Sequence, residues 1–108
     1  MRFRILIAPQ AMVDLRRLGA RDRATILDAI EMHLAFQPER TSRSRIKRLR
    51  GLSRPQFRLR VADEFRVLYD VTETTVEVLG IVGKSEVGDW LQRHGESDEE
   101  SGSIGTEG

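Results

Sequence analysis

The alternating stretch FRLRVADEFRVLYDV, at residues 57–71, constrains the fold more than any other part of the chain. Apolar residues occupy every second position from Phe57 to Val61, and Arg58 and Arg60 lie between them. After a short turn the alternation resumes, and Arg66 lies between the apolar residues Phe65 and Val67. A period of two is typical of β-strands with one buried face. The pattern therefore predicts an antiparallel strand pair that carries three arginines on one face.

Apolar periodicity also predicts the elements on either side of this pair. Gly19 is expected to end the first helix in a left-handed conformation, and Asp22 to cap the second. The predicted elements are a strand at 2–7, a helix from Pro9, a helix ending before Pro38, strands at 56–61, 65–71 and 76–82, and a short helix from Ser85 to about Arg93. The strand at 76–82 is nearly all apolar, which predicts the central, doubly covered position in the sheet.

The buried side of the second helix is predicted from one apolar stripe. Ile26, Ile30 and Leu34 recur at helical spacing, and Leu27 and Phe36 are expected to widen the stripe. The basic segment that follows, at 38–55, has no periodic pattern. We expect it to be irregular and anchored to the core by Ile46, Leu49 and Leu52.

These elements predict an α+β fold of order β-α-α-β-β-β-α. Its mostly antiparallel four-stranded sheet carries the N-terminal helical hairpin on one face and ends in a short C-terminal helix. One domain is expected over residues 1–94. The acidic, Gly- and Ser-rich stretch 95–108 is expected to be a disordered tail, because it has too few apolar residues to offset the entropy of ordering.

The net charge of +1 conceals a strong asymmetry along the chain. Five acidic and no basic residues lie between Glu96 and Glu107, which leaves 18 basic and 12 acidic residues before them. Ten of the basic residues, nine of them arginine, fall between Arg40 and Arg66. Arginine binds phosphate bidentately, so this segment suits a polyanion, although a solvated face or an acidic protein partner would have the same composition.

Composition narrows the class of site further. The chain has no cysteine, which excludes thiolate catalysis and cysteine-based metal sites, and we expect neither a metal nor a cofactor. No apolar run approaches the roughly 20 residues of a membrane span. The first ten residues, MRFRILIAPQ, lack the long apolar core of a secretory signal. We therefore expect a cytoplasmic protein.

The three strand arginines suggest chemistry at phosphorus. Attack of a ribose 2′-hydroxyl on the adjacent phosphate builds negative charge that fixed guanidinium groups stabilise. Lys84 follows the last strand and could join them, and His94 is the candidate for proton transfer; His33, within a helix, is expected to be structural. Arg58 and Arg60 could instead form ordinary surface ion pairs with nearby acids, namely Asp63, Glu64, Asp70 or Glu77.

The sequence resembles the RelE/ParE superfamily of bacterial toxins over about residues 1–91. The resemblance rests on KRLRGLSRPQFRLRV at 47–61, EFRVLYDV at 64–71 and VEVLGIVGKSEV at 76–87, in that order after a strand and a helical pair. It implies the toxin of a type II toxin–antitoxin module. RelE-like members cleave messenger RNA in the ribosomal A site without metal, and a cognate antitoxin binds them; operator DNA is bound only by the complex.

The resemblance also implies roles for individual residues. Arg58, Arg60, Arg66 and Lys84 match the catalytic basic positions of the family. His94 is a possible substitute for the usual C-terminal tyrosine or histidine. The other basic residues of the central segment are candidates for binding RNA: Arg43, Arg45, Lys47, Arg48, Arg50 and Arg54.

Two departures from the family pattern leave alternatives open. Ser85 stands where the family has an arginine, and the C-terminal tyrosine is absent. Tyr69, the only tyrosine, has the register of the apolar face and is expected in the core. A ParE-like inhibitor of DNA gyrase and a catalytically inactive, antitoxin-binding protein are the alternatives to a messenger-RNA endonuclease.

Overall fold

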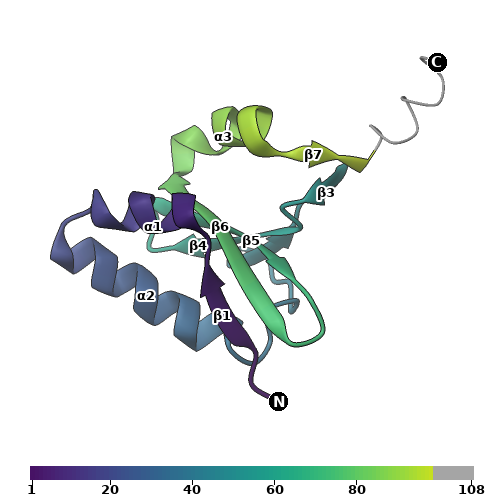
Figure 1. Cartoon of the computed structure of the whole chain (residues 1–108), viewed down its shortest axis with the longest axis horizontal. Helices are drawn as coiled ribbons and strands as arrows, with labels where there is room; N and C mark the ends of the chain where they lie inside the picture. Colours follow the sequence, from purple (N-terminus) through teal and green to yellow (C-terminus); the bar gives the residue numbers. More distant parts are fainter. Residues whose placement is uncertain (99–108) are drawn as a thin grey trace.

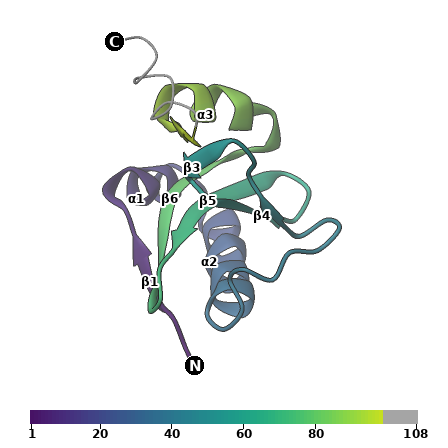
Figure 2. The same cartoon turned by 90° about the vertical axis from the view of Figure 1, so that its right-hand side faces the viewer.

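A computed structural model describes residues 1–98 and shows two helices on one face of a five-stranded sheet (Figure 1). A third helix and a two-stranded ribbon lie on the other side of the sheet (Figure 2). The elements in chain order are β1 (Arg4–Ile7), α1 (Pro9–Arg16), α2 (Ala20–Leu34), β2 (Ile46–Arg48), β3 (Leu52–Arg54), β4 (Phe57–Val61), β5 (Phe65–Val71), β6 (Thr75–Gly83), the 3₁₀ turn η1 (Lys84–Glu86), α3 (Val87–His94) and β7 (Glu96–Ser97).

The sheet confirms the predicted α+β class and adds one strand to it. Its strand order is β1-β6-β5-β4-β2, and β1 pairs with β6 in parallel while the other neighbours are antiparallel. The fifth strand, β2, comes from the basic segment that was expected to be irregular. As predicted, β6 is an interior strand covered on both faces, by α1 and by α3, but β2 extends the sheet beyond β4, so the middle one of the five strands is β5.

One hydrophobic core lies between the sheet and the first two helices. Ile26, Ile30 and Leu34 of α2 are at most 2% exposed, as their helical spacing predicted. Burial of each such side chain contributes about 1.5–3 kcal/mol. Leu27 and Phe36 were expected to join them but are 41% and 57% exposed. Leu27 lies about 100° around the helix from Ile26, and Phe36 follows the end of the helix, so neither faces the sheet.

The junction between α1 and α2 differs from the sequence prediction. Gly19 is extended, with φ −65° and ψ 161°, and serves as the N-cap residue of α2. Its carbonyl accepts a hydrogen bond from the backbone N–H of Arg23. Asp22 lies within the first turn, where its charge favours the helix N-terminus without capping it. Residues 17–19 therefore link the helices, and Gly19 starts the second helix instead of ending the first in a left-handed conformation.

Tyr69 confirms its predicted place in the core. Its ring stacks on Phe57 of β4 with the centroids 5.5 Å apart, and its hydroxyl donates a 2.7 Å hydrogen bond to the carbonyl of Pro38. Burial raises the pKa of this hydroxyl above its usual value. Tyr69 thus joins β4, β5 and the segment after α2, and it is unavailable as an acid–base group.

A single aromatic contact seats α3 on the opposite face of the sheet. Gly80 of β6 pairs with Leu68 of β5, and the indole of Trp90 lies directly above it. A Cβ atom on Gly80 would come within 2.6 Å of that ring, so only glycine lets the helix approach this closely. Ser85 was expected to cap the helix. Instead, Glu86 precedes α3 and no side chain caps that helix; the Glu86 carboxylate accepts a 3.0 Å hydrogen bond from the N–H of Gly83 at the start of η1.

The chain after α3 returns to the sheet through a short ribbon. Glu96–Ser97 forms β7 and pairs antiparallel with β3, and the N–H of Asp98 donates to the carbonyl of Gly51. The start of the predicted disordered tail is therefore a strand, because backbone pairing with β3 stabilises it without any apolar burial. The rest of that tail, residues 99–108, lies outside the described residues. No helix within residues 1–98 is long and apolar enough to cross a membrane.

Replacing Gly80 with alanine tests the seat of α3. The new methyl group collides with Trp90, so we expect Gly80→Ala to lower the free energy of unfolding by about 1–3 kcal/mol. Gly88, inside α3, has no atom within 4 Å of an added Cβ and is the matched control. Gly88→Ala should stabilise the protein by about 0.5–1 kcal/mol through helix propensity. Urea unfolding measures both; equal effects of the two variants would contradict the seating.

Candidate functional site

The cross-strand register brings the predicted arginines onto one face of the sheet. Arg60 of β4 lies directly opposite Arg66 of β5, and Arg58 lies opposite Leu68. On the other side of β4, Lys47 of β2 lies opposite Arg58. Directly paired residues point to the same side of a sheet, so these basic groups share the face that points away from α1 and α2. We call this side of the sheet the arginine face.

Arg58 is the least satisfied basic group on the arginine face. One of its terminal nitrogens, Nη1, is buried and has no hydrogen-bond partner among the described residues. Burial lowers the pKa of Arg58, and the charges of Arg66 and Arg60 lower it further. A buried donor without a partner costs about 1–3 kcal/mol, and more when it is charged. An anion that bound beside Arg58 would offset the repulsion among the three guanidinium groups, and it would reach the buried Nη1 only after the atoms that cover this nitrogen moved.

The turn between β4 and β5 gathers the remaining cations around Asp63. Asp63 Oδ1 accepts a 3.0 Å bond from Arg60 Nη2, and Oδ2 lies 3.0 Å from Lys84 Nζ. The backbone carbonyl of Asp63 accepts a 3.1 Å bond from Arg66 Nη1. The hydrogen bond and charge of Lys84, with a smaller effect of Arg60, lower the pKa of the Asp63 carboxyl. Three of the four predicted catalytic cations therefore contact one residue that sequence reasoning treated as a surface ion-pair partner.

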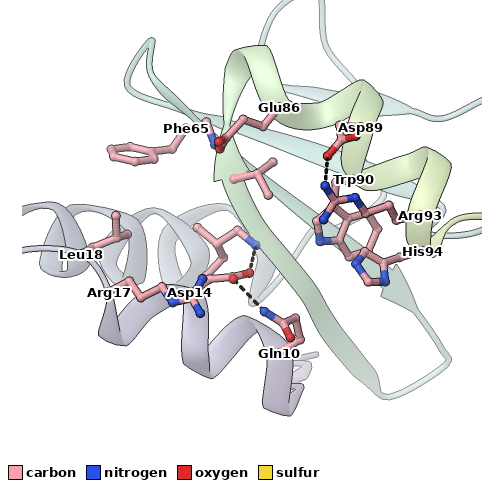
Figure 3. A pocket seen from close by; sticks show the side chains of 13 residues that line it. Gln10, Asp14, Arg17, Leu18, Phe65, Glu86, Asp89, Trp90, Arg93 and His94 are labelled. Carbon is pink, nitrogen blue, oxygen red and sulfur yellow. Dashed lines mark hydrogen bonds and ion pairs between the residues drawn. The ribbon is translucent and has the colours of Figure 1, made fainter.

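His94 is the last residue of α3. It lines a 520 Å³ cavity between α1 and α3, together with Gln10 and Asp14 of α1 (Figure 3). Its ring is 4.8 Å from that of Trp90. None of the four predicted catalytic cations lines this cavity. His94 therefore shares its cavity with α1 residues and not with these cations, although Trp90, one turn earlier in α3, lies over Gly80 on the same face of the sheet as Arg58.

Asp14 shows that the cavity also has a structural role. Its carboxylate accepts a 2.9 Å hydrogen bond from the N–H of Ile81 and a 3.1 Å bond from Gln10 (Figure 3). Strand β1 stops pairing with β6 at Val78, so the N–H of Ile81 has lost its strand neighbour. Asp14 replaces that neighbour and satisfies the edge of β6.

Of the six predicted RNA-binding residues, Lys47 extends the arginine face, whereas the Arg45 guanidinium lies 3.2 Å from the ring of His33 in α2. Lys47 lies beside Arg58, and Arg45 lines a 250 Å³ hollow with Arg60. Arg43 and Arg50 are exposed on the segments around β2.

The other two make contacts within the fold. Arg54 lies 3.1 Å from Asp70 and 3.6 Å from Glu77, and it holds the β3–β7 ribbon against the sheet. Arg48 donates a 2.7 Å bond to the carbonyl of Gln56 and lies over the ring of Phe57. Both side chains are therefore committed to protein contacts.

The described residues contain no group of three or more histidine, aspartate and glutamate side chains arranged to hold a metal ion. Two acidic residues near the arginine face, Asp63 and Asp70, are instead paired with cations. Burial raises the pKa of Asp70 in spite of the backbone hydrogen bond from Gln56 and the charge of Arg54. The basic side chains of the arginine face can therefore bind an anion and stabilise its negative charge.

Comparison with known proteins agrees with this fold. The structure resembles a chain in the crystal structure of the toxin–antitoxin complex RelBE2 from Mycobacterium tuberculosis, with a TM-score of 0.61 and 24% sequence identity. The match covers 78% of this chain and 100% of that chain. No protein-family model matches the sequence, and no curated protein matches it. The likeness confirms the fold that the sequence motifs indicated.

His33 provides a test by pH. Its ring nitrogen Nε2 accepts a 3.2 Å hydrogen bond from Arg45 Nη1, and burial, then the charge of Arg45, lower the pKa of His33 from 6.5. The unfolded chain therefore binds more protons than the folded one near that pH, so this group makes stability fall as the pH decreases. We expect the free energy of unfolding to fall between about pH 7.5 and 5.5, and to fall less in His33→Gln. Urea unfolding at both pH values measures this; an equal loss in the variant would contradict it.

Proposed function

We propose that this protein is the toxin of a toxin–antitoxin pair and that it cleaves messenger RNA on the ribosome at the arginine face. The observation that carries the proposal is the convergence of Arg58, Arg60 and Arg66 on one face, with a buried and unsatisfied nitrogen on Arg58. The fold it shares with a chain of a toxin–antitoxin complex supports the biological class.

The chemistry that suits this site is an internal displacement in RNA. The ribose 2′-oxygen forms a bond to the neighbouring phosphorus, and the bond from phosphorus to the 5′-oxygen breaks. Negative charge grows on the non-bridging oxygens, where the guanidinium groups of Arg58, Arg60 and Arg66 and the ammonium of Lys84 stabilise it. The attacking group belongs to the substrate, so the protein needs no nucleophile of its own.

The proton transfers are assigned outside the arginine face. The 2′-hydroxyl must lose a proton and the leaving 5′-oxygen must gain one. His94 lines the cavity between α1 and α3 and is not included in the proposed machinery. Water or groups of the ribosome at the cleavage site carry these protons in our proposal. Such a division agrees with an enzyme that acts on ribosome-bound messenger RNA and is located in the cytoplasm with its ribosomes.

The partner of the proposed toxin is a cognate antitoxin. A protein that neutralises this site would place acidic side chains near Arg58, where the unsatisfied nitrogen and the repelling charges favour an anion. Operator DNA would then be bound by the complex and not by this chain alone.

Substitution of Arg66 tests the proposed function. Arg66→Ala should reduce messenger-RNA cleavage by about 10²- to 10³-fold, the usual cost of removing one donor that stabilises transition-state charge. The protein should stay folded, because the Arg66 side chain bonds only to carbonyls of its own hairpin. Primer extension on a transcript from expressing cells measures the cuts. Arg21→Ala is the matched control, since Arg21 is exposed on α2, on the far side of the sheet.

The same experiment separates the alternatives. The proposal predicts codon-phased cuts with the wild-type protein and with Arg21→Ala. Growth arrest with intact messenger RNA, together with inhibition of purified DNA gyrase, would replace the proposal with a gyrase poison. Neither arrest nor cuts would indicate an inactive, antitoxin-binding protein. Cleavage by Arg66→Ala at the wild-type rate would contradict the assignment of the site.

A further inference from the structure

Asp63 occupies the point where cations from three separate elements meet. Its two carboxylate oxygens are divided between Arg60 of β4 and Lys84 of η1, at 3.0 Å each. Its backbone carbonyl accepts a hydrogen bond from Arg66 of β5. No other acidic residue in the part of the chain that the structure describes contacts two of these cations.

These contacts do more for geometry than for stability. The Asp63 side chain is 64% exposed, and exposed ion pairs contribute little to folding. The side chains of Arg60 and Lys84 are long and repel each other, so without a shared acceptor each would sample many rotamers in solvent. A carboxylate between them keeps the guanidinium and the ammonium at one place. The fold would survive its loss, but the arrangement of the two cations would not.

We propose that Asp63 is a positioning residue for the cleavage reaction, which holds Arg60 and Lys84 toward the same scissile phosphate. This inference rests on the proposed function. Asp63 acts through the two cations and does not touch the reacting atoms. Its negative charge also repels RNA, so Asp63 weakens binding while it speeds the chemical step.

The geometry does not favour a role for Asp63 as the general base. Both carboxylate oxygens already accept bonds from cations. The hydrogen bond and charge of Lys84 lower the pKa of the carboxyl, which makes it a poor proton acceptor. A positioning role uses the contacts as they stand.

Glu64 supplies a matched control within the same turn. It is exposed, and its carboxylate makes no ion pair or hydrogen bond within the described residues. Glu64→Gln therefore removes the same charge at almost the same place and leaves the contacts of Arg60 and Lys84 intact. Any effect of charge alone should appear equally in Asp63→Asn and Glu64→Gln.

The experiment measures binding and cleavage separately. Affinity is measured with a 2′-O-methyl RNA oligonucleotide, which lacks the attacking hydroxyl, and cleavage with programmed ribosomes under single-turnover conditions. We expect both variants to bind the oligonucleotide about two- to fivefold more tightly, since each loses one repelling charge. We expect the cleavage rate to fall about 10- to 100-fold in Asp63→Asn and to stay unchanged in Glu64→Gln. Asp63→Glu should recover most of the rate.

Three results would overturn the inference while leaving the proposed function intact. The first is cleavage by Asp63→Asn at or above the wild-type rate. The second is an equal loss in Asp63→Asn and Glu64→Gln, which would show an effect of charge alone. The third is loss of the acidic limb of the pH–rate profile in Asp63→Asn, which would make Asp63 the general base. A wild-type protein that leaves messenger RNA intact would instead contradict the proposed function itself.

Discussion

The pairing of β4 with β5 is the constraint on which the rest of the structure depends. Stacking of Phe57 on Tyr69 and the hydrogen bond of Tyr69 to Pro38 fix this pair on its buried side. Since side chains alternate along a strand, a slip of one residue would expose these rings and bury the arginines. Apolar packing on one face thereby sets Arg60 opposite Arg66 on the other. The core determines the geometry of the site without touching it.

The arginine face is electrostatically costly, and the surrounding residues limit that cost. Arg58 is partly buried near two like charges, with a nitrogen that has no partner. At the edges of the face other cations have acidic partners: Arg54 pairs with Asp70 and Glu77, and Arg60 and Lys84 share Asp63. The pattern leaves the strongest unmet demand for an anion in the middle of the face. This distribution is expected for a site that binds a phosphate group.

Local patterns in the sequence predicted the long elements and missed the short ones. The alternation in β4 and β5 is independent of distant residues, and β5 was predicted at its observed bounds, Phe65–Val71. Strands β2, β3 and β7 are two or three residues long and exist only through pairing with partners elsewhere in the chain. No periodicity can appear in so few residues. The extended conformation of Gly19 likewise follows from how α2 starts, and not from the type of residue.

In the candidate site, too, local sequence patterns predicted some features, and tertiary contacts determine the others. The shared face of Arg58, Arg60 and Arg66 follows from strand alternation, so the sequence was sufficient to predict it. The contact of Asp63 with Lys84, 21 residues away, depends on where η1 leaves the sheet. The position of His94 depends on the seat of Trp90 on Gly80, a tertiary contact that composition and spacing do not reveal. The ion pair of Arg54 with Asp70 is likewise a tertiary contact and could not be predicted from the sequence.

NMR signals of the arginine side chains test most directly whether RNA binds at the arginine face. A titration of the protein with a 2′-O-methyl RNA trinucleotide, observed through the Nε–Hε NMR signals of arginine, reports on each guanidinium. If RNA binds at the arginine face, the signals of Arg58, Arg60 and Arg66 shift together along one saturation curve while that of Arg48 does not. Shifts confined to Arg43 and Arg50, with the strand arginines unchanged, would show that RNA binds elsewhere.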